Sequence, residues 1–170
     1  MEDEPYGIDK KHAHQRAKQL VSEDFFWDCV DELAPFGSDE GDMALSEFRR
    51  WRNSNYNSPL IECLQWTIES VGEMRFEEYD DRILDKELIK NQINDSNYND
   101  QQYISTLDIS IIATGFGQLV DEGKIEENSK QIIKLAIDRQ VKWTESNKEL
   151  DYKKEYLYKL KVLKRILKEA

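Results

Sequence analysis

The segment from Glu23 to Asp42 (the acidic segment) combines acidic and aromatic side chains at high density. It contains eight carboxylates and no lysine, arginine or histidine, and four aromatic residues lie among the acids. Carboxylates in such numbers can bind a metal ion, imitate nucleic-acid phosphates, or face a basic protein. The acids from Asp28 onward do not follow the alternating spacing of an EF-hand calcium loop. The segment therefore favours a cationic protein partner over a metal ion.

The predicted partner-binding residues are seven of these acids and one tryptophan. They are Asp24, Trp27, Asp28, Asp31, Glu32, Asp39, Glu40 and Asp42. A structural interpretation stays open beside this one, because aspartate is favoured at helix N-termini. In that interpretation Asp24 and the acids at 39–42 begin helices, whereas the acids at 28–32 form a solvated face. We expect no metal site and no cofactor.

Arg49, Arg50 and Arg52 form the one tight basic cluster in the acidic half of the chain. Guanidinium groups bind phosphate and carboxylate through paired hydrogen bonds, so the cluster is a candidate anion site. The alternative is that Trp51 lies in the core while the arginines pair with Glu47 or with acids of the acidic segment. Exposed ion pairs of that kind contribute little to stability.

His12 and His14 are the two histidines of the chain. Residues two apart on a helix point in directions about 200° apart, so these two cannot bind one metal ion together. An enzyme that uses histidine as a general base would depend on one of them. The alternative to an interaction protein is therefore a ligand-binding domain or hydrolase-like enzyme. In that alternative, His14 meets Asp28 together with Asp39 or the three arginines.

Asp108 lies among apolar residues of a long helical pattern. A buried carboxylate without a partner has a raised pKa, which is common at functional sites. The other interpretation places Asp108 at the edge of the apolar face or beside a lysine. The chain has no glycine-rich phosphate loop, nucleophile elbow or paired-cysteine metal motif. These absences favour a non-enzymatic protein.

The residues around the acidic segment resemble a known family. The run Phe26-Trp27-Asp28, then Ala34-Pro35-Phe36-Gly37-Ser38-Asp39-Glu40-Gly41-Asp42, followed by Leu45, Phe48 and Trp51, resembles the signature of the YfeS-like family of small bacterial proteins. The likeness covers residues 12–71. The shorter pattern of Pro-Phe, then an acidic pair, then a helix is also similar to uncharacterised domains encoded near bacterial toxin–immunity loci. The resemblance implies a compact bacterial domain and carries over no catalytic residue, because the family has no assigned activity.

Helical spacing predicts a single all-α domain over residues 1–170, with six to eight helices. The predicted helices span residues 10–21, 22–33, 41–53, 59–71, 85–93, 100–122, 129–143 and 148–168. The helix at 100–122 is apolar around most of its circumference, so we expect it at the centre with the last two helices against it. A frayed N-terminus at 1–9, an irregular or β segment at 73–79 and a polar loop at 91–102 complete the prediction.

Short polar residues mark where the predicted helices begin. The predicted N-caps are Ser22, Ser58, Asp100, Asn147 and one of Ser38, Asp39 and Asp42. In the last helix an apolar stripe follows at Tyr152, Tyr156, Leu160, Leu163 and Leu167. The stripe is too short for a coiled coil, but it suits packing within the fold or in a weak dimer. We therefore expect a monomer or a weak dimer through Tyr152–Leu167.

Composition sets the class of protein. The chain has 170 residues, 39% of them hydrophobic, which is enough to bury a core without disulfides. Residues 1–100 contain 24 acids and 11 bases, whereas residues 101–170 contain 11 acids and 13 bases. This acidity argues against a broad nucleic-acid-binding face. No apolar run is long enough to cross a membrane, and the first residues are acidic, unlike a signal peptide. We expect Cys29 and Cys63 to be buried, reduced thiols and the protein to be cytoplasmic.

The preferred function is a non-enzymatic interaction protein whose acidic segment binds a basic protein. An immunity protein that neutralises a toxin would be one form of it. Acids at this density accelerate the encounter with a cationic partner. The slightly basic last helix offers a second outcome, in which it neutralises part of the acidic segment within the fold.

Overall fold

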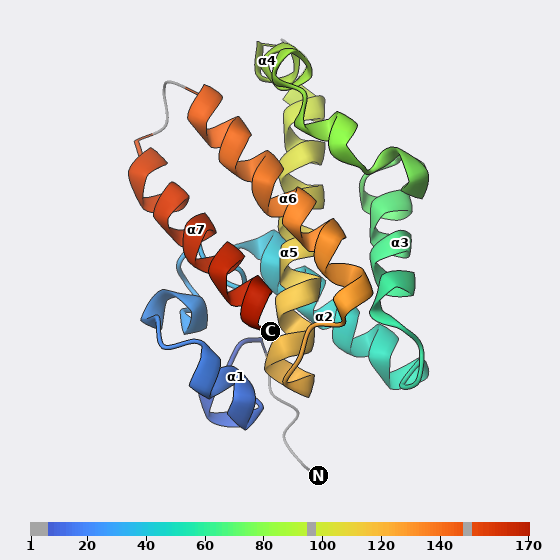
Figure 1. The fold of residues 1–170 in the computed structure, drawn as a ribbon, viewed down its shortest axis with the longest axis vertical. Helices are drawn as coiled ribbons and strands as arrows, with labels where there is room; N and C mark the ends of the chain where they lie inside the picture. Colours follow the sequence, from blue (N-terminus) through green and yellow to red (C-terminus); the bar gives the residue numbers. More distant parts are fainter. Residues whose placement is uncertain (1–6, 95–97, 148–150) are drawn as a thin grey trace.

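The protein is all-α, as the sequence predicts (Figure 1). The computed structural model describes residues 7–94, 98–147 and 151–170, with side chains throughout except at 98–103. These residues form seven α-helices and no β-strand. The helices are α1 (Gln15–Leu20), α2 (Asp39–Ser54), α3 (Leu60–Val71), α4 (Lys86–Asn94), α5 (Tyr98–Glu122), α6 (Glu127–Ser146) and α7 (Lys153–Glu169). Short 3₁₀-helices lie at η1 (Lys10–His12), η2 (Asp24–Trp27), η3 (Phe76–Glu78) and η4 (Asp81–Leu84).

Helix α5 is the centre of the fold, which confirms the prediction for the helix at 100–122. Every residue from Ser110 to Val120 is buried. Helices α2, α3 and α6 pack against α5, and α7 packs on α6 (Figure 1). Gly123 closes the helix as predicted, in the left-handed region with a φ of 79°. Among the described helices, none is both long and apolar enough to span a membrane.

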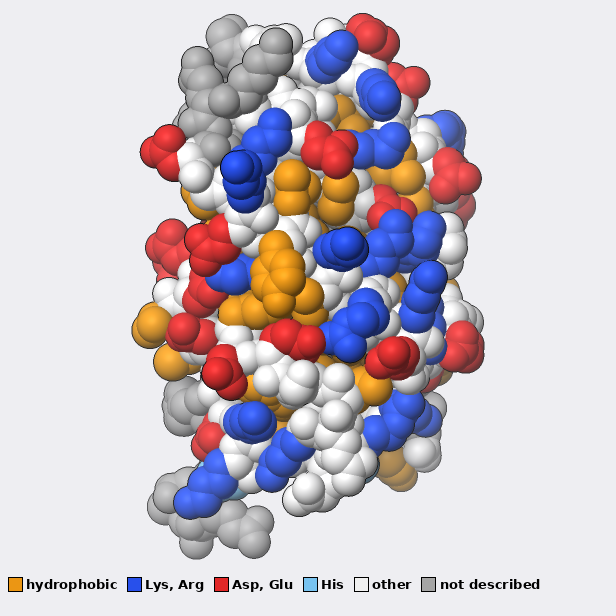
Figure 2. Space-filling model, turned by 60° about the vertical axis from the view of Figure 1, so that its left-hand side comes forward, with side chains coloured by type: hydrophobic (Ala, Val, Ile, Leu, Met, Phe, Trp, Pro, Cys, Tyr) orange, Lys and Arg blue, Asp and Glu red, His pale blue; other side chains and the backbone are white. Residues whose placement is uncertain are grey.

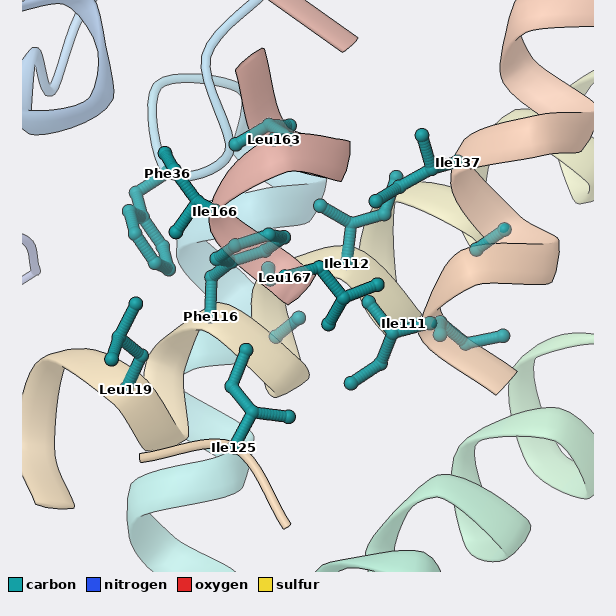
Figure 3. Packing of buried hydrophobic residues seen from close by; sticks show 14 of the residues in the cluster. Phe36, Ile111, Ile112, Phe116, Leu119, Ile125, Ile137, Leu163, Ile166 and Leu167 are labelled. Carbon is teal, nitrogen blue, oxygen red and sulfur yellow. The ribbon is translucent and has the colours of Figure 1, made fainter. Parts of the chain in front are cut away.

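The aromatic residues of the acidic segment anchor it to this centre. Phe26 packs edge-on against Phe116 of α5 and against Phe36, with ring centroids 5.8 and 5.5 Å away. Figure 3 shows Phe116 close to Phe36 and to Ile166 and Leu167 of α7. Burying a phenylalanine side chain contributes about 1.5–3 kcal/mol. The acidic segment is therefore held by its apolar residues, and its acids remain near the surface.

The prediction of a helix at 22–33 is wrong. The chain forms only η2, preceded by Glu23 rather than by a cap at Ser22, and then a series of turns up to α2. Asp28 and Asp31 explain the difference, because each carboxylate accepts a hydrogen bond at 2.9 Å from the backbone N–H two residues later. Such local side-chain bonds compete with the helical ones.

The N-terminal predictions are partly wrong. The helix predicted at 10–21 is divided into η1 and α1, and His14 caps α1. Residues 1–6 of the predicted frayed region lie outside the described residues, whereas Ile8 is buried and Asp9 caps η1. Residues 7–9 are thus part of the fold rather than a loose end.

Several helix starts differ from the prediction. Ser38 is confirmed as the N-cap of α2, because its hydroxyl accepts from the Gly41 N–H at 3.0 Å. Pro59 rather than Ser58 precedes α3, and Asn147 ends α6 instead of capping α7. The helix α5 begins two residues before Asp100.

One of the two segments predicted to be irregular is largely helical, and the other is irregular apart from a short 3₁₀-helix. Most of the polar loop predicted at 91–102 lies in α4 and α5, and residues 95–97 lie outside the described part. The segment at 73–79 contains η3 and no strand.

Candidate functional site

A pocket of about 620 Å³ lies where the acidic segment meets α5, α6 and α7; we call it the acidic pocket. Its carboxylates are Asp31, Glu32, Asp39, Glu40 and Glu155. Its aromatic side chains are Trp143, Tyr152 and Tyr156. Among the described residues, no lysine, arginine or histidine lines it. The pocket therefore brings together four of the eight predicted partner-binding residues, and adds Glu155 from the other end of the chain.

Tight turns position the acids of the segment. A Cβ at Gly37 would lie 1.9 Å from the backbone oxygen of Asp31, so only glycine allows this close approach. Asp39 and Glu40 lie in the first turn of α2, where the helix dipole favours acids. The structural interpretation of the acids is thus correct for these two, but both side chains are exposed and line the pocket.

Helix α7 neutralises part of the acidic segment. The buried Lys159 ammonium pairs with Asp31 and, at 2.8 Å, with Glu155. Burial alone would lower the pKa of Lys159, but hydrogen bonds to these two carboxylates raise it above its ordinary value. The Arg165 guanidinium of α7 forms an ion pair with the carboxylate of Glu23. Figure 2, with the α7 side turned forward, shows basic side chains intermingled with acidic ones.

The other three acids of the pocket remain available. Glu32, Asp39 and Glu40 are exposed, and none of them forms a hydrogen bond or ion pair with a described residue. Toward the described part of the chain, these three carboxylates are therefore unpaired.

The floor of the pocket belongs to a buried polar network around Asp108. Arg139 donates three hydrogen bonds to this carboxylate, at 3.1, 2.8 and 2.7 Å, and Gln140 donates another at 2.9 Å. The Tyr79 hydroxyl also donates to Asp108, at 2.8 Å, and the Tyr156 hydroxyl donates to Gln140 at 3.0 Å. Asp108 is fully buried, so it lies inside the core and pairs with an arginine rather than a lysine.

The two tyrosines and the arginine around Asp108 keep their ordinary protonation states at neutral pH. Burial raises the pKa of Tyr79 and of Tyr156, so both hydroxyls stay protonated and donate. Burial works against the charge of Arg139, but the Asp108 charge and hydrogen bonds outweigh it and raise the pKa of the guanidinium. Tyr79 and Tyr156 are therefore hydrogen-bond donors in this network, and Arg139 is its cation.

The remaining predicted residues lie apart from the pocket. Trp27 donates its indole N–H to the Val21 carbonyl at 3.2 Å, and Asp28 binds the Val30 N–H. Asp24 and Asp42 are exposed in the first turns of η2 and α2. The predicted set is thus divided between a pocket and its surroundings.

Each arginine of the cluster forms an ion pair with a carboxylate of the protein. Arg49 binds both oxygens of Asp121 at 2.9 Å. Arg52 binds Glu122 at 2.8 Å, and its guanidinium lies 4.9 Å from the centre of the Trp51 ring. Only Arg50 pairs with the predicted Glu47, at 3.1 Å. The three arginines thus pair with carboxylates, as the second interpretation expects; Glu47 holds Arg50, whereas acids at the end of α5, and not those of the acidic segment, hold Arg49 and Arg52.

The groups proposed for a histidine-based enzyme take part in separate contacts. His12 pairs with Asp9 at 2.6 Å, and the His14 ring accepts from the Arg16 N–H at 3.1 Å. The Asp28 carboxylate accepts a hydrogen bond from the Val30 N–H in its own turn. Within the described residues no cluster of three or more His, Cys, Asp or Glu side chains could hold a metal ion. The structure does not bring this catalytic set together.

The stripe predicted as a dimer surface is used inside the fold. Tyr156, Leu160, Leu163 and Leu167 are buried, and only Tyr152 is exposed. In this conformation the stripe is not available for a second copy. Cys63 is buried, and burial raises the pKa of its thiol to about 12, whereas Cys29 is exposed, contrary to the prediction.

A second concavity was not predicted from the sequence: a groove of about 700 Å³ between α2, α3 and α5, which we call the apolar groove. Its apolar residues are Met43, Ala44, Phe48, Trp51, Trp66 and Val71. Met43 and Trp66 are 65% and 52% exposed, which is unusual for side chains of this size. Met43 and Trp66 lie outside the apolar stripes of α2 and α3, and this position is the sequence signal that could have revealed the groove.

Comparisons with known proteins give one relative. No protein-family model matches the chain, and no solved structure matches it significantly. Among curated proteins the chain is similar to the "Uncharacterized protein YfeS" of Escherichia coli strain K12, with 30% identity over 143 residues. The match covers 81% of this chain and 54% of the relative, so the chain spans about half of that protein's length. The predicted resemblance to a YfeS-like protein is thus confirmed over that stretch.

Proposed function

We propose that the protein is a non-enzymatic interaction module whose acidic pocket binds a lysine or arginine side chain of a basic protein partner. The observation that supports this most directly is a group of three exposed carboxylates at one pocket with aromatic side chains, Glu32, Asp39 and Glu40, which have no partner among the residues that the structure describes. An immunity role, in which the partner is a toxin, is one form of the same function.

The chemistry of the pocket suits a long cationic side chain. Its carboxylates attract the charged head, and the rings of Trp143, Tyr152 and Tyr156 suit the aliphatic stem or stack with a guanidinium. Acids outside the pocket, such as Asp24, Asp28 and Asp42, add to the field that steers a cationic protein toward it.

A peptide of lysine and serine, acetylated and amidated at its ends, tests the proposal. Calorimetry measures its affinity for the wild-type chain and for two variants with the same change of charge. Asp39→Lys lies in the pocket, whereas Glu77→Lys is at an exposed position outside it. We expect Asp39→Lys to weaken binding about tenfold, equivalent to about 1.4 kcal/mol, and Glu77→Lys to weaken it much less. Equal losses in the two variants would show that net charge, and not the pocket, binds the peptide.

A further inference from the structure

The apolar groove and the acidic pocket share two residues. Asp39 and Glu40, in the first turn of α2, line both concavities. One turn of helix therefore separates a surface that attracts cations from a surface that presents exposed apolar side chains. A partner that reaches the acidic pocket passes beside the groove.

The interior of the groove is chemically suited to apolar side chains. The hydroxyls of Thr67 and Thr114 donate to carbonyls of their own helices, at 2.9 and 2.7 Å, so they offer no hydrogen to a ligand. The one arginine among its described lining residues, Arg50, pairs with Glu47. Two charged groups at the groove, the carboxylates of Asp39 and Glu40, have no partner within residues 7–94, 104–147 and 151–170.

We propose that the apolar groove binds the apolar side chains of the same basic partner, so that the ligand is an amphipathic cationic protein segment. This inference rests on the proposed function and adds the partner's chemistry to it. Charge complementarity favours a cationic occupant, because the carboxylates of Asp39 and Glu40 attract lysine or arginine side chains and repel an anionic segment. Leucine-sized residues enter the groove between Met43 and Trp66, and neighbouring lysines or arginines meet the acids of α2.

Two peptides of equal length and charge test the inference. One is the lysine–serine peptide above, and the other has leucine at each serine position in a helical spacing. We expect the lysine–leucine peptide to bind the wild-type chain about tenfold more tightly, the change expected when one leucine-sized side chain leaves water. Met43→Glu should abolish this preference, and Trp66→Ser should reduce it. Leu88→Glu, the same kind of change at an exposed apolar residue outside the groove, is the control.

Each outcome separates the two proposals. If Asp39→Lys weakens both peptides but Met43→Glu and Trp66→Ser leave the leucine preference intact, the groove inference is wrong and the acidic-pocket function stands. If Met43→Glu removes binding of the lysine–leucine peptide while Asp39→Lys changes neither peptide, the acidic pocket takes no part. In that case the proposed function of the acidic pocket is wrong, and so is the inference that one partner binds both the pocket and the groove. If neither peptide binds the wild-type chain, both proposals are overturned.

Discussion

Lys159 of α7 forms an ion pair with Asp31, which lies 128 residues earlier in the chain. The lysine is buried, and its second partner is Glu155. One internal cation thus occupies two of the five carboxylates of the acidic pocket. The last helix is in this sense a partner of the acidic segment, and the three acids that it leaves unpaired are those assigned to an external cation.

Lys159→Met should have two opposite effects. The variant keeps the side-chain length but removes the internal cation, so we expect the free energy of unfolding to fall by about 1–3 kcal/mol. Affinity for the lysine–serine peptide should rise, because Asp31 and Glu155 then have no internal partner. Urea denaturation and calorimetry measure the two effects. Weaker peptide binding by a folded variant would mean that Lys159 organises the pocket instead of competing for it.

Asp108→Asn should be strongly destabilising. The change leaves the Arg139 charge buried without its counter-ion, which typically costs about 3–5 kcal/mol. Adding Arg139→Met should recover part of the loss, because the double variant contains no unpaired buried charge. Denaturant unfolding measures both variants, with the exposed Asp81→Asn as a control expected to change stability by less than about 0.5 kcal/mol. A single variant as stable as the control would exclude a stabilising role for the network.

Stability should fall at alkaline pH. The pKa values of Tyr79 and Tyr156 are raised by burial, so both stay protonated in the folded state. In the unfolded chain they ionise near pH 10, so the folded state binds more protons and stability decreases as pH rises above that value. Tyr79→Phe should flatten the decrease of unfolding free energy between about pH 9.5 and 11. An unchanged slope would contradict the contribution assigned to this hydroxyl.

The two cysteines should differ in reactivity. Cys29 is exposed, whereas Cys63 is buried with its pKa raised to about 12, so its reactive thiolate is scarce at pH 8. A disulfide reagent should therefore modify one thiol rapidly, and Cys29→Ser should remove that phase. Two rapid phases in the native chain would indicate that the region of α3 around Cys63 opens.

The sequence predicts those parts of the fold that depend on local spacing. The helical period of Leu107, Ile111 and Leu119 predicts the central helix, and Ser38 is one of three candidate N-caps that the sequence offers for α2. The region after η2 was predicted incorrectly because Asp28 and Asp31 use their carboxylates on nearby backbone N–H groups. Residue type permits that outcome, but does not distinguish it from a solvated helical face.

The site depends more on contacts between distant residues. The acids of the segment are visible in the sequence, whereas Trp143 and Glu155 join the pocket only because α6 and α7 pack beside it. The start of α3 shows the same limit, since Glu126 accepts from the Leu60 N–H at 3.1 Å across 66 residues. The spacing of residues along one helix contains no signal for such partners.

The salt dependence of lysine–serine peptide binding tests the central claim most directly. Calorimetric titrations of the wild-type chain and Asp39→Lys across a range of sodium chloride concentrations give the affinity and its slope against salt. Because exposed carboxylates attract the peptide, we expect wild-type affinity to fall steeply as salt screens them, and Asp39→Lys to bind more weakly with a shallower slope. Wild-type binding that is insensitive to salt, or a slope that Asp39→Lys leaves unchanged, would contradict an acidic pocket that binds a basic partner.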